Sequence, residues 1–343
     1  MLVVLHGAKK NVGDVLIRER GLALLRHVRP DQELRVLPRW EPLTDEALEG
    51  AEAVVLCGGP GLAPHFYPGV FPIGAALDGR RIPILPLALG WSGQPADAPE
   101  RFTFDEPSLR ALREIHSRIG WSSVRDDLSL KLLEAADIGE ARRTGCAAWY
   151  HLPSLGKAPA AVSSVGRLVF TPPARSGRHF RETVQVLRLL RRRNPDAERF
   201  CVFHRGLRTG TGTRRREAAV VSALAAVARA LGYRVVDASY RLEAIDFYAE
   251  CDLHVGYRVH AHLGFLSLRK PSMLLCEDGR GVGQAVTLGD PYELRAGTPD
   301  VVDRLEAALE REEADGHPML IRAVEEIERT WPVMKETIEQ LPE

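Results

Sequence analysis

Arg258 and His260 stand two residues apart in the segment 256–261, which reads Gly-Tyr-Arg-Val-His-Ala. A guanidinium grips a carboxylate or a phosphate through two hydrogen bonds, and an imidazole titrates near neutral pH. Together the two side chains can bind an anion and move a proton at one place. A lone histidine on a helix is more often structural, and His254 in its apolar stretch is expected to be buried, but the neighbouring arginine favours a site at His260.

The elements that must position this pair alternate between short apolar strands and amphipathic helices, a pattern typical of parallel sheets covered on both faces. In the first half we expect strands at 2–6, 33–37, 53–57, 82–89 and 122–125, and helices at 15–28, 44–48, 108–119 and 127–136. In the second half we expect strands at 167–171, 200–204, 234–237, 253–255 and 272–276, and helices at 179–193, 216–231, 242–251, 259–268, 301–313 and 318–341.

These elements predict an α/β fold of two tandem doubly wound, Rossmann-like domains, a GT-B-like architecture. We place the domains at 1–157 and 158–316, followed by a helix at 317–343 that can pack back on the first domain. The segment 149–166 holds two prolines and two glycines and is interpreted as the linker. The site is then expected in the interdomain cleft, where the carboxyl ends of the strands face each other.

Two turns of the first domain could serve either the fold or a ligand. In the first, Asp14 is placed to cap the next helix, while Gly13 allows a close approach of ligand or backbone beside Asn11. In the second, Gly58 and Gly59 follow a strand, and their N–H groups could face an anion. Glycine is also common in purely structural turns, so neither motif is decisive.

A third motif, 123–129, places Arg125, Asp126 and Asp127 at the end of a strand. Asp126 or Asp127 can cap the helix that follows, with Ser129 completing that turn. Arg125 at the domain junction is a ready clamp for carboxylate or phosphate.

Taken in order, these motifs resemble the polysaccharide pyruvyl transferase family. The resemblance rests on Asn-x-Gly-Asp at 11–14, Gly-Gly at 58–59, Arg-Asp-x-x-Ser at 125–129, Gly-x-Arg-x-His-Ala at 256–261, Lys-Pro at 270–271 and a polar loop at 277–280. It implies a two-domain enzyme that transfers an enolpyruvyl unit from phosphoenolpyruvate to two hydroxyls of a sugar or glycan, free or carried on a lipid or nucleotide. The expected setting is exopolysaccharide or cell-wall glycan synthesis in bacteria.

The implied chemistry assigns roles to the residues. His260 would be the general acid, with a near-neutral pKa that a dianionic phosphate raises further. Arg258, Arg125 and Arg280 would hold the carboxylate or phosphate, beside Gly58 and Gly59. Asn11, Gly13, Asp14 and Asp126 would shape the acceptor side, where Asp14 could orient a hydroxyl. No step calls for a divalent metal or a redox cofactor, so phosphoenolpyruvate is expected as co-substrate and no cofactor beside it.

The chain departs from the family pattern at three places. Gly-Cys-Ala stands at 145–147 where relatives often carry Asp-Pro, Arg280 is the best match for a basic residue across 279–283, and the loop 60–69 carries His65 and Tyr67. Two alternatives therefore stay open. One is a GT-B glycosyltransferase with a nucleotide-sugar donor, and the other is a non-catalytic carbohydrate-binding relative.

The composition of the chain limits the kinds of binding partner that we expect. The 343 residues carry 46 basic and 46 acidic side chains, so no net field draws the chain to nucleic acid or anionic lipid. The arginine runs 191–193 and 214–216 are interpreted as polar surface near helix ends. Five dispersed cysteines are typical of small buried side chains in a reducing cytoplasm, and no apolar run has membrane-spanning length. We expect a cytoplasmic protein without nucleic-acid partner or transmembrane segment.

Overall fold

The first half of the chain builds on a sheet of four parallel strands in the order β2-β1-β3-β5. The computed structural model describes residues 1–91, 93, 99–160, 162, 164–211 and 213–342. The strands are β1 (Leu2–His6), β2 (Leu34–Pro38), β3 (Ala53–Cys57) and β5 (Ile84–Leu87). Every residue of β3 is buried, which explains its unbroken apolar sequence, since a central parallel strand is covered on both faces.

Further strands extend this sheet beyond β5. Leu89 pairs with Val124 of β7 (Ser122–Val124), which pairs with β8 (Ala141–Arg143), while β4 (Pro60–Leu62) pairs with β6 (Gly90–Trp91). The helices of this half are α1 (Val12–Val28), α2 (Glu106–His116) and α3 (Asp127–Ala135). Short helical turns lie at Phe66–Val70, Ala75–Gly79, Pro99–Arg101, Ala147–Trp149 and Leu152–Ser154.

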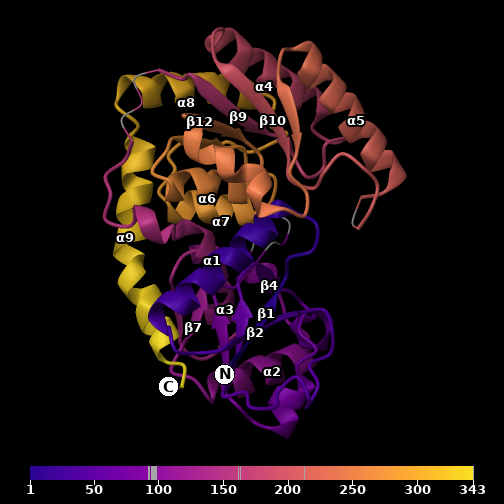
Figure 1. Ribbon diagram of the computed structural model, residues 1–343, viewed down its shortest axis with the longest axis vertical. Helices are drawn as coiled ribbons and strands as arrows, with labels where there is room; N and C mark the ends of the chain where they lie inside the picture. Colours follow the sequence, from indigo (N-terminus) through magenta and orange to yellow (C-terminus); the bar gives the residue numbers. More distant parts are fainter. Residues whose placement is uncertain (92, 94–98, 161, 163, 212, 343) are drawn as a thin grey trace.

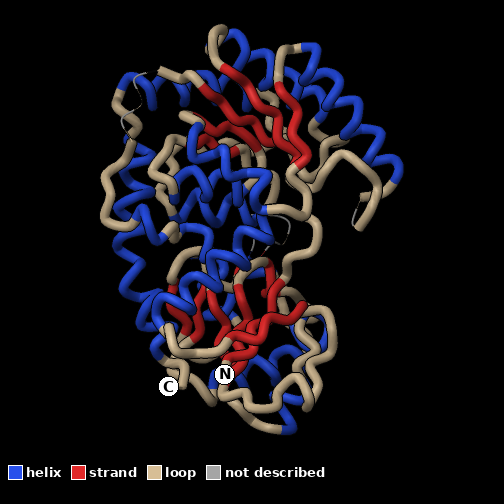
Figure 2. The backbone as a smooth tube through the Cα atoms, in the orientation of Figure 1, coloured by secondary structure: helices blue, strands red, loops and turns tan. Residues whose placement is uncertain are grey.

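The second half repeats the architecture with five parallel strands in the order β11-β10-β9-β12-β13. They are β9 (Arg167–Thr171), β10 (Glu198–Phe203), β11 (Arg234–Asp237), β12 (Leu253–Gly256) and β13 (Ser272–Leu274). Around them lie α4 (Phe180–Arg193), α5 (Arg215–Ala230), a 3-10 segment (Leu242–Glu250), α6 (Val259–Ser267), α7 (Gly279–Thr287) and α8 (Val301–Ala314). The predicted α/β fold with two doubly wound units is confirmed, and Figure 2 shows the two groups of strands separated by helices.

Three expectations for the elements were wrong. Residues 44–48 form turns instead of a helix, and a helix, α7, begins at Gly279 where a polar loop was expected. The expected linker 149–166 begins inside the core, since Trp149 and Tyr150 are fully buried with the first sheet. Residues 161 and 163 of that segment lie outside the described residues.

Close packing explains α7, whose glycine-rich sequence disfavours a helix. A Cβ at Gly281 would lie 3.0 Å from Cys276 Cα, and one at Gly283 would lie 2.8 Å from the carboxyl carbon of Asp126. The helix therefore needs small residues to approach α3 and the end of β13. Tertiary contacts thus override the local preference.

The last helix, α9 (Pro318–Glu339), runs along both halves (Figure 1). Met319 at its start joins the core of the second unit, while Ile327 and Ile338 join the core that holds Leu2 of β1. Arg29 at the end of α1 donates to the carbonyl of Leu341 at 2.6 Å. The chain therefore ends beside the unit in which it began. The boundaries expected at residues 157 and 316 stay a prediction. Among the described residues, no helix is long and apolar enough to cross a membrane.

Candidate active site

Three helices begin around one recess between the two units. The recess is lined by residues from the starts of α1, α6 and α7 and from the end of β10: Asn11, His204, Tyr257, Arg258, Val259, His260, Glu277, Asp278 and Arg280. Helix N-termini carry partial positive charge, so their convergence with arginines favours an anion. The cavity volume is about 20 Å³, room for about one water.

The start of α1 lies directly against His260. Its N-cap is Asn11, whose side-chain oxygen accepts from Gly13 N at 3.3 Å, so the expected cap at Asp14 was wrong. The helix begins at Val12, and this places Asp14 in its first turn. A Cβ at Gly13 would lie 2.9 Å from His260 Nδ1, so glycine is required for the contact.

His260 is buried, and its Nε2 finds no hydrogen-bond partner among the described residues. Burial, followed by the positive charges of Arg125, Arg280 and Arg258, lowers the pKa of His260 to about 3. The near-neutral pKa expected from the sequence is therefore wrong. At a pKa of about 3 the imidazole is neutral at pH 7, and a nearby anion would raise this pKa.

Arg258 precedes α6 and also has a buried nitrogen, Nε, without a partner among the described residues. Burial is the main cause that lowers its pKa to about 10, so the guanidinium stays charged at neutral pH. Its backbone N–H donates to Thr171 Oγ1 at 3.3 Å, which ties the segment to the end of β9. A half-buried cation with an unused Nε donor is well suited to a ligand carboxylate or phosphate.

A buried hydrogen-bond chain supports this segment from behind. Thr171 Oγ1 bonds to His254 Nε2 at 2.8 Å, and His254 Nδ1 bonds to Ser272 Oγ at 2.7 Å. Ser272 Oγ also bonds to His262 Nδ1 at 2.8 Å. The expected burial of His254 is confirmed, and His262 belongs to the same structural network, away from the recess.

Replacing Thr171 with valine tests this support. The apolar side chain leaves His254 Nε2 and Arg258 N without their shared partner, which should cost about 1–3 kcal/mol of the free energy of unfolding. Thr171→Ser keeps the hydroxyl and should stay close to the parent protein. Urea unfolding of both variants measures the effect. Equal free energies of unfolding for Thr171→Val and the parent protein would show that this hydrogen-bond chain does not support the segment.

Arg125 and Asp126 form a buried pair at the start of α3. Arg125 is 1% exposed, and its Nε donates to Asp126 Oδ2 at 2.9 Å and its Nη2 to Trp91 O at 2.5 Å. Asp126 is the N-cap of α3 and accepts from Ser129 N at 2.8 Å, as one of the predicted alternatives had it. Arg125 Nη1 is buried and has no partner among the described residues, so this charged group has one unused hydrogen-bond donor.

Residues that sequence reasoning missed hold Arg125 in place. Gln284 of α7 donates to Arg125 O at 3.1 Å and accepts from Trp149 Nε1 at 2.7 Å. A Cβ at Gly90 would lie 2.0 Å from Arg125 Nε, so the guanidinium packs flat on that glycine. These contacts connect Arg125 to α7, to Trp149 of the expected linker and to β6.

Arg280 lies in the recess, but it is paired there with an acid. Its Nε donates to Asp278 Oδ1 at 3.0 Å, and Asp278 also caps α7 by accepting from Arg280 N at 3.0 Å. The guanidinium faces Asp14 and Glu277 as well. Arg280 is thus paired with a carboxylate, as Arg125 is, but only Arg280 of the two lines the recess.

One of the two amides of the expected anion turn is already used by the fold. Gly58 N donates to Leu87 O at 2.7 Å, so this amide is already bonded to the sheet. Gly58 and Gly59 have φ of +59° and +76°, and a Cβ at Gly58 would lie 2.5 Å from Ile17 Cγ2. These glycines let the turn pass beneath α1, which shapes the wall of the site.

Arg39, at the end of β2, is a further site residue that the sequence analysis missed. Its Nη2 donates to Pro60 O at 3.3 Å, whereas Nη1 is buried without a partner among the described residues. Its charge faces Asp14 and Arg125.

Asp14 faces three arginines: Arg280, Arg39 and Arg205. Burial nevertheless raises the pKa of Asp14 above its ordinary value. The site therefore holds a carboxylate among several cations.

The loop that leads into α1 also fastens the two units together. Lys10 Nζ donates to Arg208 O at 2.9 Å and to Thr213 Oγ1 at 3.2 Å, both from the loop after β10. Val12 N donates to His204 O at 3.0 Å. These bonds fix the start of α1 relative to the second unit and define the present width of the recess.

Buried histidines make the stability depend on pH. The pKa values of His260 and His262 are lowered to about 3, mainly by burial, and those of His204 and His254 also lie well below 6.5. Below pH 6.5 these histidines bind protons in the unfolded chain but stay neutral in the folded chain. Their contribution to the free energy of unfolding is therefore complete above pH 6.5 and falls as the pH drops towards 3.

We expect the free energy of unfolding to fall between pH 7.5 and 5.0, by up to about 1.4 kcal/mol per pH unit for each such histidine. Urea unfolding at several pH values measures the slope. His262→Gln, away from the recess, should make the slope shallower, and an unchanged slope would contradict the assignment.

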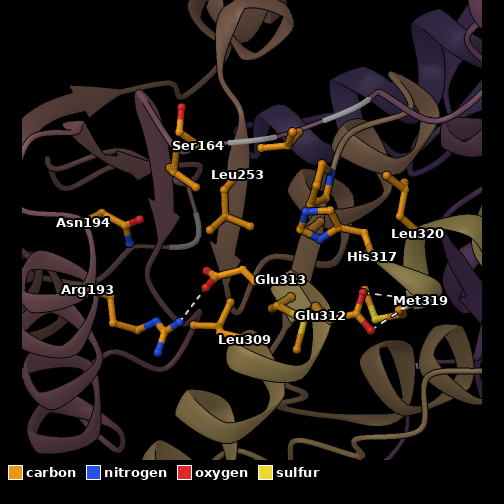
Figure 3. Close-up of a pocket in the computed structure, with 15 residues that line it drawn as sticks. Ser164, Arg193, Asn194, Leu253, Leu309, Glu312, Glu313, His317, Met319 and Leu320 are labelled. Carbon is orange, nitrogen blue, oxygen red and sulfur yellow. Dashed lines mark hydrogen bonds and ion pairs between the residues drawn. The ribbon is translucent and has the colours of Figure 1, made fainter. Parts of the chain in front are cut away.

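A larger cavity, of about 280 Å³, lies at the opposite, amino end of the second sheet (Figure 3). Leu253 and Met273 line it from the strands, and Met319 lines it from the start of α9. Its acids are engaged: Glu313 accepts from Arg193 at 2.8 Å, and Glu312 accepts from Met319 N at 3.2 Å. These contacts join α8, α4 and α9, which is a structural role.

The fold defines the class of protein. The S. aureus MnaA–UDP co-structure matches with a TM-score of 0.58 at 10% identity, covering 98% of this chain and 93% of that one. A putative UDP-N-acetylglucosamine 2-epimerase from Listeria monocytogenes has a TM-score of 0.56 at 11% identity, covering 96% and 93%. UDP-GlcNAc 2-epimerase from Neisseria meningitidis bound to UDP-GlcNAc has 0.53 at 12%, covering 99% and 100%. The chain has the GT-B fold of these enzymes.

The family follows from the sequence. The model of the family described as polysaccharide pyruvyl transferase matches residues 11–275. The chain belongs to this family of transferases. A search of curated proteins finds no match.

Proposed function

We propose that this chain transfers the pyruvyl unit of phosphoenolpyruvate to two hydroxyls of a sugar or glycan, forming a cyclic ketal and releasing phosphate. The observation that carries the proposal is the recess itself. Arg258 and His260 face it with unpartnered nitrogens, Arg125 lies behind them, and three helices begin around it. An anionic donor that must be protonated at carbon suits this arrangement, and family membership supports it.

Binding of the donor would set the protonation state of His260. The phosphate and carboxylate of phosphoenolpyruvate would lie against Arg258, which lines the recess, with the charge of Arg125 behind it. Each of these guanidinium groups has one buried nitrogen without a partner among the described residues. Their negative charge would raise the pKa of His260 from its low value in the empty site. The imidazole would therefore acquire its proton together with the donor.

In the chemical step, His260 would give this proton from Nε2 to the methylene carbon, leaving an oxocarbenium-like centre at the adjacent carbon. An acceptor hydroxyl adds to that carbon and loses its proton, for which Asp14 is the nearby base. Phosphate leaves with the electron pair of its carbon–oxygen bond, while Arg258 and Arg125 balance the growing charge. A second hydroxyl would then attack the same carbon and give its proton to the now neutral His260, which closes the ketal.

The experiment measures phosphate release from phosphoenolpyruvate with a panel of sugars, sugar phosphates and glycosyl diphosphates. We expect release that depends on an acceptor and produces an acid-labile ketal. A nucleotide-sugar donor is the competing function, because the GT-B structures above include complexes with UDP and UDP-GlcNAc. Thermal stabilisation by UDP-sugars and none by phosphoenolpyruvate would overturn the proposal.

A non-catalytic carbohydrate-binding role is the remaining alternative, and a cellular test addresses it. The proposed setting is glycan synthesis in a bacterial cytoplasm. A strain with His260→Ala should lose the pyruvylated glycan while the variant protein still accumulates. Unchanged glycan and growth would point to a binding function on the same scaffold.

A further inference from the structure

A second buried imidazole, that of His204, lines the recess, and the proposed reaction gives it no role. His204 follows β10 and is 1% exposed. Its backbone carbonyl accepts from Val12 N at 3.0 Å, which places it where the start of α1 meets the second unit. Arg258 and His260 line the same recess. The His204 side chain therefore lies where the proposed donor would bind.

The two ring nitrogens of His204 have different surroundings. Nε2 lies 2.9 Å from the hydroxyl oxygen of Tyr248, a residue of the 3-10 segment Leu242–Glu250. Nδ1 is buried and has no hydrogen-bond partner among the described residues. Buried polar atoms without a partner are uncommon in folded proteins, and each one needs a physical reason. On a residue that lines a recess, such a nitrogen indicates a place for a ligand atom.

Tyr248 determines which nitrogen of His204 carries the hydrogen. The tyrosine is 2% exposed, and burial raises the pKa of its hydroxyl well above the ordinary value, so the hydroxyl keeps its hydrogen. Among the described residues, the ring of His204 is the one hydrogen-bond partner of this hydroxyl. The hydroxyl therefore donates to Nε2, and the neutral imidazole has its hydrogen on Nδ1. The opposite tautomer would leave both the hydroxyl hydrogen and Nδ1 without a partner.

The same contact keeps His204 neutral. Burial, followed by Arg258 and His260, lowers the pKa of His204 well below 6.5. Protonation would add a hydrogen to Nε2, and the hydroxyl of Tyr248 would then lose its acceptor. At His260, by contrast, Nε2 finds no hydrogen-bond partner among the described residues. The two imidazoles are therefore suited to different tasks, a fixed hydrogen-bond donor and a group that can change its protonation.

The carboxylates that line the recess are already engaged. Glu277 accepts from Ala174 N at 2.6 Å and from Arg175 N at 3.1 Å. Asp278 accepts from Arg280 Nε at 3.0 Å and caps α7. These bonds hold both acids to the protein, so the hydrogen-bonding capacity that the recess leaves unused lies on its nitrogens.

The unused nitrogens of the recess favour an anionic oxygen. The recess-lining residues with a buried, unpartnered nitrogen are, within the described part of the chain, His204, Arg258 and His260. A carboxylate or a phosphate has at least two oxygens, so it can accept from Arg258 and from His204 at once. The imidazole adds direction, because Tyr248 holds the opposite end of its ring.

We propose that His204 is a further ligand-binding residue of the candidate active site, and that Tyr248 positions it to donate from Nδ1 to the anion held by Arg258. This hydrogen bond orients the anion beside His260. The identity of the anion as the carboxylate or phosphate of phosphoenolpyruvate rests on the proposed function. His204 takes up no proton in the reaction, and Tyr248 acts on the ligand only through His204.

The tautomer of His204 can be measured without a ligand. Nuclear magnetic resonance of protein labelled with ¹⁵N at histidine should show a neutral ring with its hydrogen on Nδ1, and His204→Asn should remove that signal. Tyr248→Phe removes the hydroxyl that fixes the tautomer, so the ring should no longer hold its hydrogen on Nδ1 alone. A hydrogen fixed on Nε2 in the parent protein would overturn the proposal.

Calorimetry with phosphoenolpyruvate, and separately with inorganic phosphate, measures the binding role. His204→Phe removes the donor and should weaken the binding of phosphoenolpyruvate by about 10- to 100-fold, as expected for the loss of a hydrogen bond to a charged group. His204→Asn keeps an N–H group near the position of Nδ1 and should recover part of the affinity. Tyr248→Phe should weaken binding by a smaller factor, because the imidazole remains but its hydrogen is no longer fixed.

Tyr233→Phe is the matched control for Tyr248→Phe. Tyr233 is 3% exposed and donates to Leu187 O at 2.8 Å, so the variant loses one buried hydrogen bond away from the recess. It should bind both probes like the parent protein. An equal loss of affinity in Tyr233→Phe and Tyr248→Phe would show a general effect of stability and would remove the positioning role. Thermal unfolding checks that each variant folds, and His204→Asn and Tyr248→Phe carry the test if His204→Phe does not fold.

The two probes separate this assignment from the proposed function. Equal affinities of His204→Phe and the parent protein for both probes would overturn the assignment of His204. If phosphoenolpyruvate does not bind while phosphate binds in a manner that depends on His204, the proposed function fails and the assignment stands. If the parent protein binds neither probe, both fail.

Discussion

His260→Ala is expected to lower the rate of phosphate release from phosphoenolpyruvate by about 100- to 10,000-fold, the usual contribution of a general acid. The variant lacks the only imidazole nitrogen that we propose as proton donor, while Arg258 and Arg125 still bind the donor. Thermal stabilisation by phosphoenolpyruvate should therefore persist when turnover is lost. Stopped-flow detection of phosphate measures the rate, and differential scanning fluorimetry measures the binding.

His262→Asn is the matched control. It lies two residues further along α6, is equally buried, and has a similarly lowered pKa of about 3, but its Nδ1 bonds to Ser272. Turnover should stay within a few-fold of the parent protein, with some loss of stability. Equal rates for His260→Ala and the parent protein would remove His260 from the chemistry.

The same residue makes donor binding depend on pH. Because His260 is neutral in the empty site and is expected to take up a proton with the donor, phosphoenolpyruvate should bind more tightly as the pH falls from 8 to 6. The part of the pH dependence that comes from His260 should disappear in His260→Ala, which leaves the titration of the donor's own phosphate. Calorimetry in buffers of different ionisation enthalpy reports the proton uptake directly.

Arg125→Met should destabilise the fold by about 3–5 kcal/mol, because it leaves the charge of Asp126 buried without its partner. The variant should also lose stabilisation by phosphoenolpyruvate. Arg125→Lys retains the charge but not the planar fork and should recover only part of the stability. Urea unfolding provides the free energies.

Arg142→Met is the control for this effect. Arg142 pairs with Glu140 at 2.8 Å, but both side chains are exposed, so water already screens the pair. Its removal should change the free energy of unfolding by less than about 1 kcal/mol. A similarly small change for Arg125→Met would show that Asp126 does not depend on its partner.

Topology constrains where the candidate site can lie, and this much could be predicted from the sequence. In each parallel sheet the carboxyl ends of the strands meet at one edge, so Arg125 and Arg258 were expected at the facing edges of the two units once their strands were identified. Arg39 also ends a strand at this edge, and the same rule would have found it. The chain contains many arginines, so the position of Arg39 at the end of a strand was not distinctive in the sequence.

Other features depend on contacts between distant segments. The low pKa of His260 arises from burial beneath α1 and from three arginines, none of which is visible in the local sequence. Gln284 supports Arg125 from α7, a helix whose glycines disfavour it until Cys276 and Asp126 lie against them. Packing therefore decided the features that local propensity could not.

Helix α9 has a consequence for how the protein is made. The core around Leu2 of β1 also contains Ile327, Met334 and Ile338 from α9. Because chains emerge amino end first, part of the apolar surface of the first unit stays uncovered until α9 has been synthesised. The emergence of α9, more than 300 residues after β1, is therefore the moment at which this core can close.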